Sequence, residues 1–487
     1  MTTEPTYRML IDGRMVDSQK RLPVLNPATG EVLAGAPDCS LEQLDQAVAA
    51  ARRAFPGWRA TPWAKRGQLL KLAGGVLAAN AKTLAALLTS EQGKPHENAF
   101  GEIMGAAHWL GAMSEMKLPV QVNEDGPARR SETHHVPLGV VGGISPWNFP
   151  VLLSFWKIAP ALMAGNCIIL KPSPFTPLAM LQAGELLREI FPPGVLNIVT
   201  GGDDLGPAMT SHPGIDKISF TGSTATGKRV MQSASADLKR ITLELGGNDA
   251  AIIMPDVDVR AVAQDLFWAA FRNSGQICIA TKRMYVHADI YDAVAKALVA
   301  YACTIKIGDG AQQGVQLGPI QNRPQYERVV DLINDCKAQG LRFLLGGDVD
   351  PNAPGYFIPV TIVDNPPEQS RVVQEEAFGP VLPLLKFHDL DEVIARANDS
   401  PYGLAGSVWT KDLDQALSIA SRLETGTVWI NEVQYLTPFQ PFAGHKQSGA
   451  GVENGLEGLL EYTTPQTITT RAAAQYLPVE PALEAMQ

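Results

Sequence analysis

The spacing of hydrophobic positions changes along the chain. From Ser40 to about Leu118, apolar residues recur every three to four positions, as in LEQLDQAVAAARRAF, and this spacing predicts amphipathic helices. The segment Arg129–Gly143 instead has a strand-like pattern that ends at a glycine-bounded turn. Beyond it, short apolar strands alternate with helical stretches, which is typical of an α/β domain with a parallel sheet.

The alternating region divides into individual elements. We expect strands at Cys167–Lys171, Leu196–Thr200, Lys217–Phe220 and Ile241–Leu245, and helices at Pro177–Ile190, Leu205–Ser211 and Thr226–Ala236. A doubly wound parallel sheet binds ligands at the carboxyl ends of its strands, so the residues after each strand are candidate functional residues. A second alternating region runs from Ala251 to about His445, and the Thr-rich tail after Tyr462 is a candidate edge strand.

Composition narrows the class of protein. The 487 residues, 45% hydrophobic and 18% charged, suffice for two or three globular domains. The net charge of -10 comes without any basic block, so we expect no nucleic-acid partner. No apolar stretch reaches the roughly 18 residues of a membrane span, and Met1–Arg14 lacks a secretory pattern, which predicts a cytoplasmic protein without a membrane partner. Five widely spaced cysteines without a Cys-x-x-Cys pair predict free thiols and no metal site.

Three segments carry residues suited to catalysis. Cys278 in FRNSGQICIATKR follows a Gly-Gln turn and can be a nucleophile, although a lone cysteine is more often a core residue. Glu244 in ITLELGGNDAAII ends an apolar strand, where a carboxylate is costly unless it is paired or functional. Asn148, after Pro-Trp, can donate to an oxyanion, and Lys171 at a strand end can reach a phosphate or ribose. The alternatives are a turn cap for Asn148 and a solvated surface charge for Lys171.

These residues belong to a larger set of motifs that resembles the aldehyde dehydrogenase family. FTGSTATGK, LELGGN, F-x-N-x-G-Q-x-C, PWNFP, KPS, EEAFGPV and PFAGHKQSG occur in the order and spacing typical of that family, from LNPATGEV at Leu25 to EYT at Glu461. The resemblance implies an α/β fold with a Rossmann-type parallel-sheet cofactor domain (residues 1–115 and 138–246) and an α/β catalytic domain (residues 247–445). It also implies a small β oligomerisation element (residues 116–137 and 463–487) and a homodimer or homotetramer.

The resemblance further implies oxidation of an aldehyde to a carboxylic acid with NAD(P). Cys278 would attack the aldehyde, Asn148 and a backbone N–H would stabilise the oxyanion, and hydride would pass to the nicotinamide. Glu244, with a pKa raised by its apolar strand, would activate the water that hydrolyses the thioester. The catalytic set is Cys278, Glu244, Asn148 and Lys171.

Family-like contacts extend to the cofactor and the substrate. Lys171 and Glu376 would hold the two riboses, and glycines would let the pyrophosphate approach a helix start. The cofactor set is Ser145, Trp147, Lys171, Ser173, Gly222, Ser223, Gly227, Leu245, Glu376 and Phe378. The substrate tunnel set is Phe149, Trp156, Arg272, Leu436 and Phe442, whose aromatic members suggest an apolar or aromatic aldehyde. Arg272 can bind a substrate carboxylate or form a structural ion pair, and we favour the ion pair.

Three alternative functions and one departure from the family motifs bear on this prediction. The segment GSTATGKR is a near match to the phosphate-binding loop motif of a nucleotide triphosphatase, but Arg229 stands where that motif has the magnesium-binding hydroxyl residue. A CoA-acylating relative would typically lack the water-activating Glu244, and a purely structural role would not require the catalytic set. Pro174 stands where most NAD-preferring relatives carry a ribose-binding glutamate. The choice between NAD and NADP therefore stays open, and we favour NAD.

Overall fold

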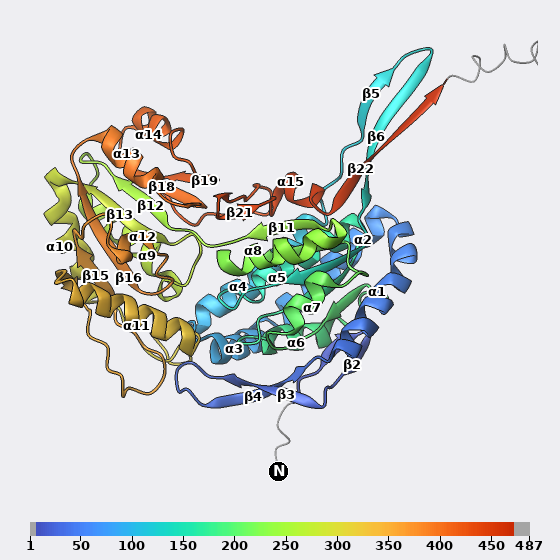
Figure 1. The fold of residues 1–487 in the computed structure, drawn as a ribbon, viewed down its shortest axis with the longest axis horizontal. Coiled ribbons are helices and arrows are strands. Elements are labelled where there is room, and N and C mark those ends of the chain that lie inside the picture. The colour runs from blue at the N-terminus through green and yellow to red at the C-terminus, as the bar shows by residue number, and fades with distance from the viewer. Residues whose placement is uncertain (1–5, 472–487) are drawn as a thin grey trace, which may run out of the picture.

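The computed structural model describes residues 6–471 of the chain. Residues 1–5 and 472–487, which include the end of the predicted oligomerisation segment, lie outside the described residues. Two large sheets flanked by helices form the body, and a three-stranded sheet projects from the body as an arm (Figure 1). This architecture confirms the predicted α/β class with a Rossmann-like parallel sheet.

An eight-stranded sheet forms the first part of the body. Its order is β2-β1-β9-β8-β7-β10-β11-β21. The central pairs from β9 to β11 are parallel, whereas β1, β2 and β21 pair antiparallel at the edges. The strands are β1 (Met9–Ile11), β2 (Arg14–Val16), β7 (Val140–Ile144), β8 (Cys167–Lys171), β9 (Leu196–Ile198), β10 (Lys217–Thr221), β11 (Arg240–Glu244) and β21 (Gly449–Ala450).

The strand order brings several carboxyl ends to one edge of this sheet. The chain proceeds from β7 through β8 to β9 on one side and continues through β10 to β11 on the other. Ile144 lies opposite Lys171, and Thr221 lies opposite Glu244. Because ligands bind where the strand order reverses, the edge that carries Lys171 and Glu244 is the expected site.

Helices pack against this sheet, and two of them begin at clear capping residues. The Ser40 hydroxyl accepts a hydrogen bond from the backbone N–H of Gln43, whose side chain accepts one in return, so α1 begins with a capping box. The Ser223 hydroxyl accepts from the backbone N–H of Thr226 at the start of α8. The helices are α1 (Leu41–Ala60), α2 (Trp63–Ala79), α3 (Ala81–Gln92), α4 (His96–Met113), α5 (Leu152–Ala164), α6 (Leu178–Leu187), α7 (Leu205–Ser211), α8 (Thr224–Ala234) and α15 (Gly455–Leu460).

A seven-stranded sheet forms the second part of the body, in the order β14-β15-β16-β13-β12-β18-β19. All its pairs are parallel except that of β14. Along β12, Ala250 and Ile252 join one hydrophobic cluster while Ala251 and Ile253 join another, so both faces are buried. This explains the continuous apolar run of β12.

The strands of this second sheet are β12 (Asp249–Ile253), β13 (Thr281–His287), β14 (Phe343–Leu345), β15 (Thr361–Asp364), β16 (Val381–Phe387), β18 (Ala405–Trp409) and β19 (Thr427–Ile430). Its helices are α9 (Val259–Phe271), α10 (Tyr291–Ala302), α11 (Arg323–Ala338), α12 (Arg371–Gln374), α13 (Leu390–Asn398) and α14 (Leu413–Ala420).

The arm is an antiparallel sheet with the order β22-β6-β5. It joins β5 (Gln121–Asp125) and β6 (Arg129–Pro137) to β22 (Thr463–Arg471), and it stands away from the body (Figure 1). Val122 and Ile468 on the arm are about half exposed. Two ribbons complete the fold, β3 (Lys20–Leu25) with β4 (Val32–Asp38), and β17 (Tyr402–Gly403) with β20 (His445–Lys446).

The elements predicted in the alternating region are confirmed with shifts of a few residues, as β8 to β11 and α6 to α8. The prediction of a single strand-like segment over Arg129–Gly143 is corrected, because these residues form two strands that belong to different sheets. β6 ends at Pro137, and Gly139, with a φ of 136° that favours glycine, separates it from β7. The predicted domain limits stay a prediction.

Across residues 6–471, no single helix has both the length and the apolar character needed to cross a membrane. The helices α2 and α3 pass that test only as a pair, and the pair is bent by 70°.

Candidate active site

Cys278 follows a strained turn after α9. Asn273 and Ser274 have φ values of 52° and 55°, a left-handed conformation that is rare outside glycine. Their buried side chains fix this turn, since Ser274 Oγ donates to the carbonyl of Gly318 at 2.7 Å and Asn273 Nδ2 donates to the carbonyl of Asn148 at 3.4 Å. The turn therefore holds the cysteine loop next to Asn148.

Glu244 ends β11 beside Cys278. Its side chain is 4% exposed, and neither carboxylate oxygen receives a hydrogen bond of good geometry from the described residues. Burial raises the pKa of Glu244 to about 8, and the neighbouring Cys278 thiol and Lys157 ammonium offset only part of this effect. Burial and the Glu244 carboxylate in turn raise the pKa of the Cys278 thiol well above its ordinary value. The raised pKa expected for Glu244 from its apolar strand is thus confirmed.

Asn148 lies just before α5 and is held from both sides. Its Nδ2 donates one hydrogen bond to the carbonyl of Gln276 at 3.0 Å, which leaves the second amide hydrogen for another acceptor. Its backbone carbonyl accepts from Lys94 Nζ at 2.8 Å. Lys94 is paired with Glu102, with side chains 1% and 0% exposed, and Glu102 also accepts from two backbone N–H groups at the start of α5.

Side chains from both large sheets surround one cavity of about 120 Å³ at the edge of the eight-stranded sheet. The predicted site residues that it brings together are Trp147, Asn148, Gly222, Ser223, Glu244, Leu245, Cys278, Glu376 and Phe378. The other residues along its wall are Pro146, Leu153, Thr221, Gly246, Gln325 and Arg328.

The start of α8 offers a place for a phosphate. The first backbone N–H groups of a helix have no carbonyl partner within it, and the helix dipole favours a negative charge there. Gly222 and Ser223 line the cavity at this point. A Cβ on Gly227 would lie 2.5 Å from Leu245 Cδ2, so glycine lets α8 pack closely on the end of β11.

Glu376 and Phe378 enter the cavity from the loop between α12 and β16. Glu376 Oε1 accepts from the backbone N–H of Gly247 at 3.2 Å, and a Cβ on Gly246 would lie 2.4 Å from Glu376 Oε2. The Phe378 ring meets the Trp147 ring edge-to-face at 5.3 Å. This cradle has the apolar and carboxylate surfaces that fit a nicotinamide riboside.

Lys171 ends β8 outside the wall of this cavity. It is 6% exposed, and its Nζ has no hydrogen-bond partner among residues 6–471. Burial lowers the pKa of Lys171 to about 8, although the carboxylates of Asp203 and Asp38 favour its charged form. A buried ammonium without an acceptor fits the hydroxyl groups of a ribose.

Two predicted cofactor residues are engaged within the fold. The hydroxyl of Ser145 bonds that of Ser154 at 2.8 Å, and Ser173 Oγ accepts from the backbone N–H of Phe175 at 3.3 Å. Neither Ser145 nor Ser173 lines the cavity.

Four of the five predicted tunnel residues belong to an apolar cluster that packs against Cys278. Trp156 stacks on Trp109 at 5.5 Å and meets Phe442 edge-to-face at 5.9 Å. The other two, Phe149 and Leu436, pack against the same cluster. The cluster therefore gives the cysteine an apolar, largely aromatic surface.

Arg272 does not form the structural ion pair that we favoured from the sequence. Its side chain is exposed and makes no ion pair or hydrogen bond within the described part of the chain. It lines a second cavity of about 540 Å³ together with Phe149 and Trp268. Of the two carboxylates that line this cavity, Glu102 is buried and paired with Lys94, and Glu97 makes no ion pair with Arg272 among the described residues.

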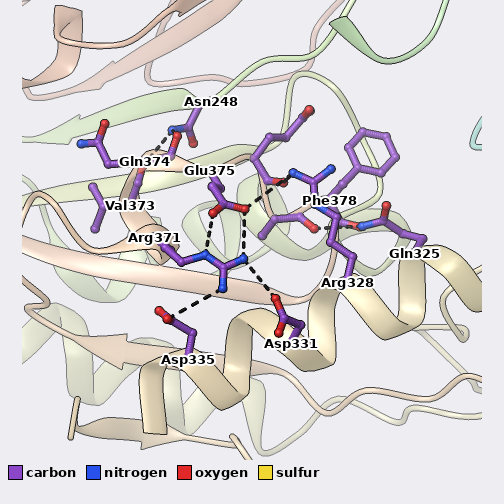
Figure 2. A network of polar contacts seen from close by, with 12 residues as sticks. Asn248, Gln325, Arg328, Asp331, Asp335, Arg371, Val373, Gln374, Glu375 and Phe378 are labelled. Carbon is purple, nitrogen blue, oxygen red and sulfur yellow. Dashed lines mark hydrogen bonds and ion pairs between the residues drawn. The ribbon is translucent and has the colours of Figure 1, made fainter. Parts of the chain in front are cut away.

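Sequence reasoning missed Gln325 and Arg328, which reach the cavity from α11. Gln325 Nε2 donates to the carbonyls of Ala377 and Phe378 at 3.0 and 3.1 Å, and Arg328 donates to the carbonyl of Glu376 at 3.2 Å. Figure 2 shows both side chains directed at this segment. No motif marked them, because polar residues on a helix surface are ordinary.

A buried cation behind Glu244 was also missed. Lys157 is fully buried and donates to Thr221 Oγ1 and to Glu453 Oε1, both at 2.8 Å. A lysine inside the apolar run LLSFWKIAPALMA was the available signal, because a buried ammonium requires a carboxylate partner.

Comparison with known proteins places these features in a family. The family description that matches residues 15–468 is that of the aldehyde dehydrogenase family. A probable aldehyde dehydrogenase from Pseudomonas sp is 44% identical over 471 residues, covering 96% of this chain and 95% of that protein. Phenylacetaldehyde dehydrogenase from Pseudomonas fluorescens is 40% identical over 95% of each chain.

Solved structures agree with the sequence comparison. The NAD+ complex of an aldehyde dehydrogenase from Bacillus cereus has a TM-score of 0.94 at 37% identity, covering 96% of this chain and 97% of that one. These similarities do not favour a nucleotide triphosphatase or a CoA-acylating enzyme. The chain belongs to the aldehyde dehydrogenase family and is an NAD(P)-dependent enzyme that oxidises aldehydes.

Proposed function

We propose that this aldehyde dehydrogenase works through a thioester on Cys278, with Asn148 and Glu244 as its partners. The observation that carries the proposal is that these three side chains line one cavity. Cys278 first loses its thiol proton to solvent, and the resulting thiolate attacks the aldehyde carbon, which forms a C–S bond and a negatively charged oxygen. The amide hydrogen of Asn148 that Gln276 does not use is suited to stabilise that oxygen.

Formation and hydrolysis of the thioester complete the reaction. The nicotinamide cofactor, when bound, supplies the acceptor for the hydride that leaves the aldehyde carbon. Glu244 then takes a proton from water, whose oxygen attacks the thioester carbon. The C–S bond breaks, the carboxylic acid leaves, and Cys278 is regenerated. Apart from the neighbouring Cys278 thiol, no group among residues 6–471 donates a hydrogen bond to the Glu244 oxygens, and this supports the role because no structural donor occupies the carboxylate.

For the cofactor, we propose that the start of α8 holds the pyrophosphate, and that Lys171 and Glu376 hold the two riboses. The pocket favours NAD over NADP in our proposal, because Asp38 and Asp203 lie close enough to Lys171 to favour its charged form. Carboxylates at that place repel a 2′-phosphate. Pro174 supplies no such carboxylate, so we expect measurable activity with NADP as well.

For the substrate, we propose an apolar or aromatic aldehyde. The aromatic cluster of Trp156, Phe442 and Phe149 beside Cys278 supports this choice. The unpaired Arg272 at the neighbouring cavity extends the proposal to aldehydes that carry a distal carboxylate, since a guanidinium binds one bidentately. A substrate panel with Arg272→Leu tests the extension, because only the carboxylated aldehydes should lose kcat/KM.

We also propose that the arm mediates assembly into a homodimer or homotetramer. An unpaired strand edge with exposed apolar residues seeks a partner strand, and Val122 and Ile468 supply such residues. Light scattering that finds a monomer at micromolar concentration would contradict this. The cytoplasmic location and the lack of a nucleic-acid or membrane partner stay predictions.

The thioester mechanism is tested by two variants of the full-length enzyme. Cys278→Ala should lower turnover by about a thousandfold or more, because it removes the nucleophile while leaving NAD+ binding intact. Glu244→Gln should give a burst of reduced cofactor followed by slow turnover, because the amide cannot take a proton from water. Rapid-mixing absorbance and intact mass spectrometry measure the burst and the trapped acyl-enzyme.

A matched control is Cys303→Ala, which removes an exposed thiol and should leave turnover unchanged. Cys278→Ala with more than a few per cent of the wild-type rate would refute the covalent mechanism. A Glu244→Gln enzyme with neither burst nor acyl-enzyme would assign Glu244 a different role.

A further inference from the structure

The segment that carries Glu376 and Phe378 into the cavity is strained. Phe378 has a φ of 45°, a left-handed conformation that a bulky side chain disfavours. Such a conformation persists only where neighbouring contacts determine the backbone on both sides. The contacts of this segment therefore decide where Glu376 and Phe378 lie.

On its carboxyl side, the segment is pressed against α11. Gln325 binds the carbonyls of Ala377 and Phe378, as described above. A Cβ on Gly379 would lie 2.6 Å from Val329 Cγ2, so the backbone approaches α11 as closely as glycine permits. These contacts fix one end of the strained turn.

On its amino side, the segment is joined to α11 by Arg371. Its Nε donates to Glu375 Oε1 at 2.6 Å, its Nη2 donates to Asp331 Oδ2 at 3.1 Å, and its Nη1 lies 3.7 Å from Asp335 Oδ1. Figure 2 shows the guanidinium between Glu375 and the two aspartates of α11. A planar guanidinium with five N–H donors can join three carboxylates in this way, whereas an ammonium cannot match the geometry.

The charges around Arg371 make this contact hard to replace. Asp331, Asp335 and Glu375 converge on it, and the only other cation of the cluster that the structure describes is Arg328, 4.0 Å from Glu375. Without Arg371 the three carboxylates would repel one another. That repulsion would push Glu375, and with it the adjacent Glu376, away from α11.

We propose that Arg371 is a positioning residue for cofactor binding. It holds Glu376 and Phe378 in the cavity by joining the amino side of their segment to α11, although it does not itself line the cavity. This inference rests on the proposed contacts of Glu376 and Phe378 with the cofactor.

The test compares Arg371→Ala with the wild-type enzyme in equilibrium titrations with NAD+ and in steady-state kinetics. The Kd and KM for NAD+ should rise about tenfold, while kcat and the KM for the aldehyde change less than about twofold. Arg371→Lys should give an intermediate Kd, because lysine keeps the positive charge but lacks the planar set of N–H donors of the guanidinium. Arg323→Ala is the matched control. It removes an exposed ion pair between Arg323 and Glu327, both on α11, and should leave the Kd unchanged.

Two more variants separate the possible outcomes. Glu375→Ala removes the same contact from the other side and should also raise the Kd, and Glu376→Gln measures the proposed ribose contact directly. If Glu376→Gln raises the Kd but Arg371→Ala does not, the positioning role is wrong and the cofactor site stands. If neither changes the Kd, the proposed cofactor site itself is wrong. A lower melting temperature with kcat reduced and the Kd unchanged would show a purely structural role and overturn the inference.

Discussion

Two ionic clusters hold the two halves of this active site, and they differ in burial. The Lys94–Glu102 pair, 1% and 0% exposed, fixes the backbone of Asn148 on the side where the proposed mechanism places the aldehyde. The Arg371 cluster, whose guanidinium side chain is 40% exposed, fixes the segment of Glu376 on the side of the cofactor. A buried pair is stable only when complete, because each charge alone has lost its water, whereas an exposed pair contributes little to folding.

The difference follows from what each half must do. In the proposed mechanism Asn148 donates to the oxyanion and has to stay in one place throughout the reaction, so it is tied to contacts whose loss would also weaken the fold. The cofactor has to bind and leave in every turnover, so its segment is held by contacts that can be changed without loss of the fold. Folding stability and cofactor affinity should therefore respond to different substitutions.

The largest effect is expected for Glu102→Gln, which breaks the buried pair. The variant leaves the Lys94 ammonium without a counter-charge in a buried site, so the free energy of unfolding should fall by about 3 kcal/mol. Turnover should fall as well, because Lys94 and Glu102 hold Asn148 and the start of α5. Urea denaturation and kcat measure the two changes.

The exposed pair of Lys71 and Glu115, with side chains 56% and 64% exposed, provides the control for this substitution. Glu115→Gln removes the same carboxylate charge and should leave the midpoint of denaturation unchanged. If Glu102→Gln were as stable as Glu115→Gln, the distinction between the buried and the exposed cluster would fail.

A smaller effect is expected in the pH dependence of kcat. This dependence should be set by the half of the site that contains Glu244 and not by the Arg371 cluster. Burial raises the pKa of Glu244 to about 8, and below this pH the protonated carboxyl cannot take a proton from water. At saturating cofactor, kcat should therefore rise with pH and level off above a midpoint near 8. Arg371→Ala should keep this midpoint, because Arg371 lies outside the cavity, whereas Glu244→Gln should lose it. A flat wild-type profile between about pH 6 and 10 would show that a step without Glu244 limits turnover.

The parts predicted from the sequence are those that local patterns encode. The strand β8 was predicted with its observed limits because an apolar run ends at Lys171 and the following Pro172 cannot continue the ladder. Glu244 and Cys278 were predicted as catalytic residues because their segments belong to a set of seven motifs whose order and spacing resemble the aldehyde dehydrogenase family. The strand signal and each single motif lie within about a dozen consecutive residues, and the motif set is defined by order and spacing along the chain, so no knowledge of the packing was needed.

The parts that the sequence did not yield depend on contacts between distant segments. Lys94 binds a carbonyl 54 positions away, at Asn148, and no spacing rule connects them. The ion pair expected for Arg272 does not form among the described residues, and the pairing of the buried Glu102 in the same cavity with Lys94 becomes visible only from the packing of α4. Gln325 and Arg371 look like ordinary surface residues until α11 and α12 are brought together.

The smallest effect is expected at the half-buried Pro174, on the cofactor side of the proposed active site. This residue lies three positions after Lys171, in the turn that follows β8. A glutamate there can accept hydrogen bonds from two ribose hydroxyls and would repel a 2′-phosphate. Pro174→Glu should therefore increase the preference for NAD over NADP by about fivefold, measured as the ratio of kcat/KM for the two cofactors.

The loss of the proline ring also frees φ at this position, which can loosen the turn and lower kcat/KM for both cofactors equally. Pro174→Ala is the control for that effect, because it removes the ring without adding a carboxylate and should leave the ratio unchanged. The carboxylates of Asp38 and Asp203 near Lys171 already act against a 2′-phosphate in our proposal. If Pro174→Glu leaves the ratio at the wild-type value while Asp203→Asn lowers it, those carboxylates and not position 174 set the choice of cofactor.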